Sequence, residues 1–430
     1  MKRISPTIFV LAVILALGCI VAGCADMQGA ISARSAGEET LDDQSADAID
    51  SVAAGNNRFA CDLYRNLADD PKYAETNLFF SPYSISSALA ITYEGARGTT
   101  ADEIRSVLHL PENDTLRREG FSGINARMNS VDAACTLRTA NALWAEETYQ
   151  FLPEYIETAE RYYGANATNI DFINAPEESR STINRWVEER TEEKIRDLLP
   201  PGSIDPVTRL VITNAIYFEG TWVKQFDENL TRDDDFRVAP ERAVRVPMMQ
   251  RTGEDAVFNY TETGTVQVLG MPYAHESGRQ LSMLVILPND ENLTAAEAAL
   301  DPEQIGELRQ SLVSQRVDVF FPKFTLETEY SLPETLAAMG MPTAFSGAAD
   351  LSGMDGTRDL FISDVIHKAF VDVDEEGTEA AAATAVVVRL VSAPQNNDIP
   401  VFRADHPFVF LILDDDTGNI LFIGRVANPA

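Results

Sequence analysis

Side chains that could carry out catalysis are few in this sequence. Its four histidines are His109, His275, His367 and His406, and none lies in an HExxH zinc motif. The sequence also lacks a GxSxG nucleophile elbow, a Walker loop and a GxGxxG turn. A Ser-His-Asp triad is defined by geometry, so the sequence does not exclude one. Because no serine lies in a recognisable nucleophile context, these residues disfavour an enzyme.

Metal-ligating side chains do not cluster either. Apart from two cysteines near the N-terminus, only Cys61 and Cys135 occur, with no CxxC and no Cys/His cluster. Two free cysteines buried as small apolar residues are favoured over a disulfide. The acidic run at 414–419 does not fit an EF-hand, because its spacing is wrong and no bidentate Glu follows. We predict no metal site.

The segment from Glu375 to Val391 has the most unusual pattern in the chain. It reads EEGTEAAAATAVVVRLV, in which the alanines suit a helix and the β-branched residues disfavour one. Side chains alternate between the two faces of a strand. One face would then carry no charge: Thr378, Ala380, Ala382, Thr384, Val386, Val388 and Leu390. Glu379 and Arg389 both lie on the other face. The pattern fits a strand with one buried face, while an alanine-rich helix and an ordinary strand stay open.

Length and charge narrow the class of protein. The chain has 430 residues, of which 45% are hydrophobic and 23% charged, as in globular proteins. It has 34 Lys and Arg against 67 Asp and Glu, a formal net charge of −33. Binding to nucleic acid phosphates needs clustered cations, and the sequence has no basic block. We therefore expect no nucleic-acid partner.

The N-terminus is typical of a targeting segment. Lys2 and Arg3 precede a mostly apolar run at 8–20, and Val21-Ala22-Gly23-Cys24 then resembles the lipobox of secreted lipoproteins. We predict a signal over 1–24 with lipid attached at Cys24. An uncleaved anchor over 4–23 is the alternative, since that stretch is about long enough to span a bilayer. Both interpretations place the remaining chain outside the cytoplasm and tether it to a membrane.

The remaining chain divides into a short tether and one domain. Residues 25–52 hold few large apolar side chains, so we predict a flexible acidic tether followed by a domain over 53–430. Within the domain, apolar spacing predicts helices at 57–67, 84–93 and 177–199, the last ended by Pro200-Pro201. Strands are predicted at 317–326 and 361–373. Residues 408–413 and 420–426 read as a buried hairpin.

Six motifs in order make the domain resemble the serpins, which inhibit serine proteases by a suicide mechanism. The motifs are NLFFSPYSI at 77–85, TANALW at 139–144, TNAIYFEGTW at 213–222, FPKF at 321–324, HKA at 367–369 and DHPFVF at 405–410. The resemblance implies an α+β serpin fold with three β-sheets, about eight or nine helices and an exposed reactive-centre loop at about 375–400. It also implies a monomer that is not an enzyme and needs no cofactor. Its partner would be a serine protease, held as a covalent acyl-enzyme.

In the family's mechanism, a protease cuts the loop, and the cut loop inserts into the large sheet as a strand. Here the inserted strand would be 378–391. The family's spacing places the scissile bond between Val391 and Ser392, which suits elastase-like or subtilisin-like proteases with small apolar pockets. Cleavage after Arg389 by a trypsin-like protease is the first alternative. A non-inhibitory serpin acting as a binding protein, inhibition of cysteine proteases by the same loop, and a hydrolase are the others.

The resemblance also assigns roles to individual residues. The hinge that starts insertion comprises Glu375, Glu376, Gly377, Thr378, Glu379, Ala380, Ala381, Ala382, Ala383 and Thr384. Non-inhibitory relatives tend to lose this run of small residues, so its presence favours an inhibitor. A polar cluster that controls opening of the sheet comprises Ser81, Ser84, Asn214 and His367. Trp222 and Lys323 would lie where insertion begins, with Lys323 paired to Glu375.

Overall fold

The computed structural model of the chain describes residues 24–129, 135–275, 280–378 and 399–430. The chain forms two compact units, residues 1–47 and 48–430. Apart from the first part of helix α1, every element below belongs to the second unit. Most of the predicted reactive-centre loop, residues 379–398, lies outside the described residues.

The described residues contain ten α-helices, eight of them with seven or more residues. These are α1 (Cys24–Asp69), α2 (Pro82–Gly95), α3 (Gly98–Val107), α4 (Asp114–Met128), α5 (Pro153–Tyr163), α6 (Pro176–Arg190), α7 (Thr294–Ala298), α8 (Pro302–Ser311), α9 (Pro333–Met339) and α10 (Ser352–Asp355). Local sequence explains where several of them begin. Ser81, Asn113 and Asp301 cap α2, α4 and α8 by accepting hydrogen bonds from backbone N–H groups of the first turn.

The strands form three sheets. The seven-stranded sheet has the order β1 (Leu78–Phe80), β17 (Ile420–Val426), β16 (Phe408–Asp414), β9 (Leu281–Pro288), β8 (Val266–Pro272), β7 (Val257–Glu262) and β10 (Val313–Arg316). The four-stranded sheet has the order β15 (Val401–Arg403), β11 (Asp318–Pro322), β6 (Arg242–Arg251) and β5 (Arg232–Ala239). The six-stranded sheet has the order β12 (Phe324–Ser331), β13 (Asp364–Val373), β14 (Gly377–Thr378), β4 (Leu210–Thr221), β2 (Cys135–Glu146) and β3 (Asn166–Ile170). Three sheets and this set of helices confirm the predicted α+β fold.

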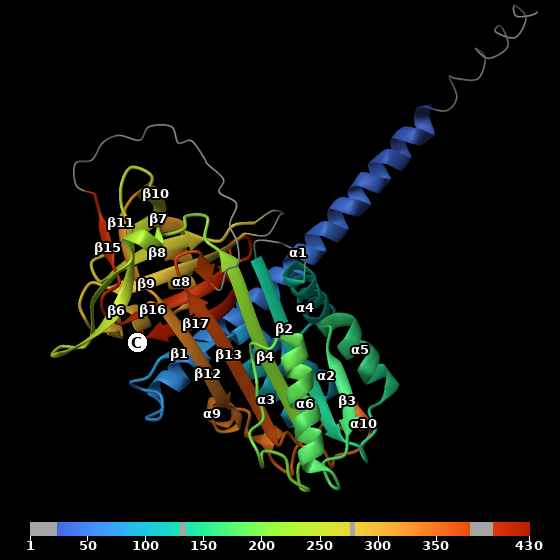
Figure 1. Ribbon diagram of the computed structural model, residues 1–430. Helices are drawn as coiled ribbons and strands as arrows, with labels where there is room; N and C mark the ends of the chain where they lie inside the picture. The colour runs from blue at the N-terminus through green and yellow to red at the C-terminus, as the bar shows by residue number, and fades with distance from the viewer. Residues whose placement is uncertain (1–23, 130–134, 276–279, 379–398) are drawn as a thin grey trace, which may run out of the picture. The chain divides into compact units, whose positions relative to one another are not determined.

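The six-stranded sheet contains the feature on which the site depends. Over most of their length β13 and β4 pair directly and in parallel, from Asp364 opposite Val211 to Phe370 opposite Tyr217. We call this pairing the seam. At one end of it the short strand β14 lies between the two and pairs antiparallel with both. Helix α6 covers one face of the sheet and α2 contacts the other (Figure 1).

Several predicted elements are confirmed and three need correction. The hairpin of β16 and β17, the helices at 57–67 and 84–93, and the two free buried cysteines are as predicted. The predicted helix 177–199 ends earlier, at Arg190, because Glu192, Glu193 and Asp197 take left-handed backbone conformations. The predicted strand 317–326 is two strands, β11 and β12. They belong to different sheets and are separated at Lys323. The predicted strand 361–373 begins three residues later than expected, at Asp364.

The N-terminal region also differs from the expectation. Residues 25–52, predicted as a flexible tether, lie in helix α1. The segment is rich in Ala, Asp and Ser and contains no proline, the residue that most strongly breaks a helix. Ala48 and Val52 are buried, so the compact part of the chain begins before residue 53. Among the described residues no helix is both long and apolar enough to cross a bilayer.

Candidate functional site

The chain reverses direction between β13 and β14 in a tight turn centred on Asp374. The Asp374 carboxylate accepts hydrogen bonds from the N–H of Glu376 at 2.9 Å and of Gly377 at 3.1 Å. The N–H of Asp374 donates to the Gly377 carbonyl at 2.9 Å. A Cβ atom on Gly377 would lie 2.1 Å from the Gly220 carbonyl oxygen. Position 377 therefore requires glycine because the backbone of β4 passes so close.

The turn is fixed to the end of β4 and to the four-stranded sheet. Trp222 donates its backbone N–H to the Glu376 carbonyl at 2.9 Å, and its indole N–H to the Asp374 carbonyl at 3.1 Å. Glu375 accepts from Lys323 Nζ at 2.5 Å and from Thr231 Oγ1 at 2.6 Å. Burial acts to raise the pKa of Glu375, but these two partners outweigh it and hold that pKa below its usual value. The predicted pairing of Lys323 with Glu375 is confirmed.

Thr378 is the last described residue of the hinge, and its side chain lies in the interior. It is fully buried, and its hydroxyl makes a 2.7 Å hydrogen bond with the Tyr273 hydroxyl. The Tyr273 ring stacks on the indole of Trp222 with 4.5 Å between centroids. Thr378 is the first residue of the uncharged face noted in the sequence. That face therefore begins on the buried side of the sheet.

The four residues of the predicted polar cluster lie together beneath the seam. His367 Nε2 accepts from the Ser81 N–H at 3.0 Å, and the Ser81 hydroxyl accepts from the Ser84 N–H at 3.2 Å. Because Nε2 is an acceptor, the proton of the neutral ring is on Nδ1, which donates to Asn214 Oδ1. Asn214 Nδ2 donates to Ser84 Oγ at 2.5 Å. His367 and Asn214 are opposite each other in the seam, so their hydrogen bond crosses it.

Burial keeps His367 uncharged. The side chain is fully buried, and desolvation lowers its pKa from 6.5 to about 3, against a smaller opposing effect from its hydrogen bond with Asn214. A second proton would sit on Nε2, which faces the Ser81 N–H donor. Protonation would thus replace a hydrogen bond with two opposed donors.

Three further residues complete the site, and sequence reasoning did not single them out: Asn141, Thr231 and Tyr273. Asn141 on β2 accepts from Asn214 Nδ2 at 2.6 Å and from Ser84 Oγ at 3.1 Å. Thr231 and Tyr273 hold the hinge as described above. Asn141 and Tyr273 lie far in sequence from the groups they bind. Asn141 does belong to the TANALW motif, which was the available signal.

Part of the predicted site falls outside the described residues. Val391, Ser392 and the hinge residues from Glu379 to Thr384 belong to this part. The described hinge residues are brought together with Trp222 and Lys323 at one end of the seam.

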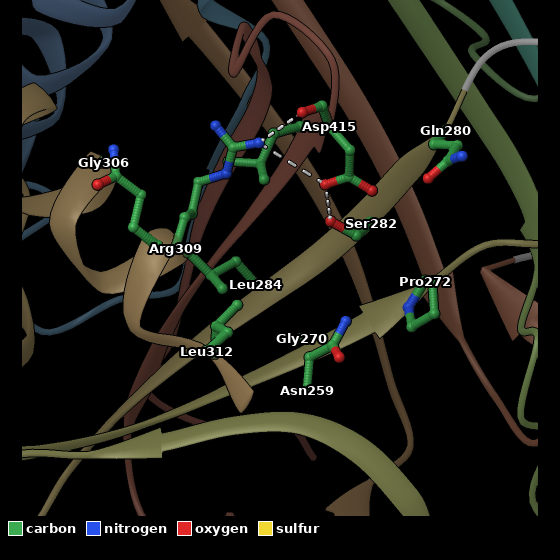
Figure 2. Close-up of a pocket in the computed structure, with 12 residues that line it drawn as sticks. Asn259, Gly270, Pro272, Gln280, Ser282, Leu284, Gly306, Arg309, Leu312 and Asp415 are labelled. Atoms are coloured by element: carbon green, nitrogen blue, oxygen red, sulfur yellow. Dashed lines mark hydrogen bonds and ion pairs between the residues drawn. The ribbon is translucent and has the colours of Figure 1, made fainter. Parts of the chain in front are cut away.

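A separate cavity of about 450 Å³ lies between helix α8 and strands β7, β8 and β9. Figure 2 shows Arg309 extending from α8 toward Asp415 and Ser282. Arg309 donates to the Asp415 carbonyl at 2.8 Å, and Ser282 donates to the Asp415 carboxylate at 2.6 Å. Burial raises the pKa of this carboxyl. Leu284, Leu312 and Leu413 supply apolar walls, so the cavity combines apolar surface with a charged pair.

Comparisons with known proteins agree with this geometry. Residues 54–429 match the family model "Serpin (serine protease inhibitor)". The chain is 42% identical over 374 residues to an uncharacterised serpin-like protein of Thermococcus kodakarensis, covering 87% of this chain and 84% of the relative. It is 41% identical over 388 residues to the leukocyte elastase inhibitor of Bos taurus, covering 89% and 100%. The crystal structure of human thyroxine-binding globulin complexed with thyroxine aligns with a TM-score of 0.78 and 30% identity, covering 90% of this chain and all of that one.

Proposed function

Because the chain belongs to the serpin family, we propose that it inhibits serine endopeptidases by trapping them as covalent acyl-enzymes. In this proposal the protease cleaves after Val391, and residues 378–391 then insert into the seam. A small aliphatic residue at the cut suits an elastase-like or subtilisin-like pocket. The bovine relative named leukocyte elastase inhibitor supports this target class. An Arg389 cut by a trypsin-like enzyme is the alternative.

The observation that carries the proposal is the position of β14. Thr378 is already paired with Val373 of β13 and with Gly220 of β4. Farther along, Phe370 faces Tyr217 and Asp364 faces Val211 in the seam. All these pairs across β13 and β4 keep the same sequence offset. An inserted strand could therefore extend β14 along both neighbours, and β13 and β4 would only need to separate, without sliding.

If the inserted strand kept this register, each loop residue would lie against defined neighbours. Ala380 would lie beside Phe218 and Val371, which are buried. Thr384 would lie between Asn214 and His367, and Val388 would reach Leu210, where β4 begins. The uncharged face would enter the interior, while Glu379 and Arg389 would face outward. Burial of Val386 and Val388 would stabilise the inserted state by ~1.5–3 kcal/mol each.

Insertion also explains how the protease would be held. Fourteen extended residues span ~46 Å at ~3.3 Å per residue, so the attached enzyme is displaced far from the loop's starting point. A displacement of ~1 Å among catalytic groups can reduce a rate by ~10²-fold. Hydrolysis of the acyl bond then becomes slow, and the covalent intermediate persists.

Mixing the chain with pancreatic elastase and, separately, with trypsin tests this function. The proposal predicts an elastase complex that survives denaturing electrophoresis and a released peptide that begins at Ser392. A complex with trypsin alone and a peptide that begins at Leu390 would move the reactive bond to Arg389. Clean cleavage by both enzymes without a complex would contradict inhibition of these two protease classes.

A second candidate is a binding protein for a small molecule. The cavity beside Arg309 and Asp415 favours it, as does the similarity to thyroxine-binding globulin. This candidate predicts loop cleavage without a covalent complex. It also predicts saturable binding of thyroxine in equilibrium dialysis, reduced by Arg309→Ala.

The proposal for location rests on the N-terminal sequence. The motif ending in Cys24 supports a lipid-anchored protein outside the cytoplasm. Mass spectrometry of the membrane fraction would test for diacylglyceryl and acyl groups on Cys24, with Cys24→Ser as the control.

A further inference from the structure

A small pocket borders the polar cluster, because Asn141 both lines the pocket and bonds Ser84 and Asn214. It offers about 200 Å³ of space among the C-terminal ends of α4, α5 and α6 and strand β2. Its walls are mostly polar: Asn125, Asn129, Asn141, Tyr163, Gly164, Ala165, Trp186 and Arg190. This volume is below the ~300–1,000 Å³ typical of drug-sized ligands. A ligand of a few heavy atoms is the appropriate size.

Hydrogen bonds hold the walls in place. Asn125 donates its amide to the Tyr163 carbonyl at 3.0 Å and accepts from the Tyr83 hydroxyl at 3.1 Å. Both ends of the Asn125 side chain are thus occupied by protein. A cation–π contact orders the rim: the Arg190 guanidinium lies over the Trp186 ring, 5.4 Å from its centroid. The pocket is therefore a formed feature of the fold.

Two donors in this frame have no acceptor among the residues that the structure describes. Asn141 uses its oxygen twice, for Ser84 and for Asn214, and its Nδ2 has no acceptor among the described residues. Arg190 makes no ion pair with any described residue. The two groups together present hydrogen-bond donors and positive charge to the pocket.

Among the described residues, the lining of the pocket contains no carboxylate. The Tyr163 hydroxyl donates to Glu94 at 2.7 Å, but Glu94 is already paired with Arg117 at 2.9 Å and Arg118 at 2.7 Å. The pocket therefore favours an anion. A guanidinium fork matches the two oxygens of a planar carboxylate, and an amide N–H adds a third hydrogen bond.

We propose that this pocket binds a small organic carboxylate through Arg190 and Asn141, and that the bound ligand slows opening of the seam. Binding would fix the Asn141 amide, whose oxygen accepts from Ser84 and Asn214. Asn214 in turn bonds His367 across the seam. The ligand thus favours the closed arrangement over one in which β13 and β4 have separated. This second step rests on the proposed insertion mechanism, whereas binding itself does not.

Calorimetric titration of the full chain with acetate, malonate and benzoate tests binding, with sodium chloride at equal ionic strength as the reference. At least one of the three should bind saturably. Arg190→Gln should weaken that binding at least tenfold. Arg185→Gln should not, because Arg185 is an exposed residue of the same helix outside the pocket. Asn141→Asp keeps the acceptor oxygen for the cluster but should abolish binding of the anion. Saturable binding by none of the three, or binding unchanged in Arg190→Gln, overturns the proposal.

A separate measurement tests the effect on the seam and needs no protease. A synthetic peptide with the sequence of residues 378–391 is mixed with the chain, and its incorporation is followed by native electrophoresis. The bound carboxylate should slow incorporation several-fold in the natural chain and not in Arg190→Gln. If the carboxylate binds but the rate of peptide incorporation does not change, the regulatory step is overturned, whereas the proposed binding site is not. If the peptide never incorporates, the proposed insertion mechanism fails instead.

Discussion

Replacing Thr378 with arginine should convert the inhibitor into a substrate. Thr378 has no exposed surface, and its hydroxyl bonds Tyr273 at 2.7 Å. In the uncut protein β14 can leave the sheet by giving up only its short pairing with β13 and β4. In the inserted strand, position 378 stays in the interior, so the arginine would be buried without an acidic partner. An uncompensated buried charge costs ~3–5 kcal/mol.

This penalty acts on a competition between two steps. After the loop is cut, insertion competes with hydrolysis of the acyl-enzyme. If insertion carries the full penalty in its transition state, it slows by roughly 10²- to 10⁴-fold, since ~1.4 kcal/mol is tenfold in rate. Hydrolysis then wins, and the protease is released active.

Denaturing electrophoresis with elastase measures the outcome as the ratio of covalent complex to cleaved chain. Thr378→Ser keeps the hydroxyl and should retain the complex. Glu376→Arg adds a positive charge two residues earlier, at a half-buried position, and should also retain it. A Thr378→Arg chain that forms as much complex as the natural chain would refute the account of the hinge.

Three further outcomes follow from individual contacts. The pKa of His367 is lowered from 6.5 to about 3, so between these pH values the unfolded chain holds one more proton. The contribution of His367 to stability is therefore complete above pH 6.5. It is lost at ~1.4 kcal/mol per unit as the pH falls toward 3. Urea midpoints measured from pH 7 to 4 should show a shallower dependence in His367→Gln, and equal slopes would contradict the assignment. Tyr273→Phe removes the hydrogen bond to Thr378, worth ~1 kcal/mol, so the β14 amides should exchange with solvent ~5-fold faster. Unchanged exchange would show that the hydroxyl does not hold the hinge. Thr384→Val should leave the uncut chain unchanged. It should lower the melting temperature of the loop-cleaved chain, because the inserted strand would lose a polar partner beside Asn214 and His367. A loss of stability in the uncut chain alone would contradict the extended register.

Much of the fold could be predicted from short-range patterns in the sequence. The alternation of 378–390 identified an uncharged face, and the structure places its first residue, Thr378, in the interior. The family motifs brought Ser81, Ser84, Asn214 and His367 into one group, and hydrogen bonds connect all four. Free cysteines and the final hairpin needed only composition and apolar runs.

Features set by long-range packing were missed. The partners of Tyr273 and Asn141 become neighbours only after the sheets assemble, and no local periodicity reports that. Helix α6 ends at Arg190, but the helical spacing of apolar residues continues to Leu198. Ile195 and Leu198 are buried in the irregular chain that follows the helix, so the spacing predicted a helix that was too long. Likewise the apolar run through Lys323 looks continuous, although the chain moves there from one sheet to another.

Thermal unfolding of the intact and the loop-cleaved chain is the most direct test of strand insertion. If residues 378–391 insert into the seam, the cleaved chain gains a central strand and the native form is metastable by comparison. The account predicts a clearly higher melting temperature after cleavage at 391, and no such rise in cleaved Thr378→Arg. Equal melting temperatures for the intact and cleaved natural chain would contradict insertion.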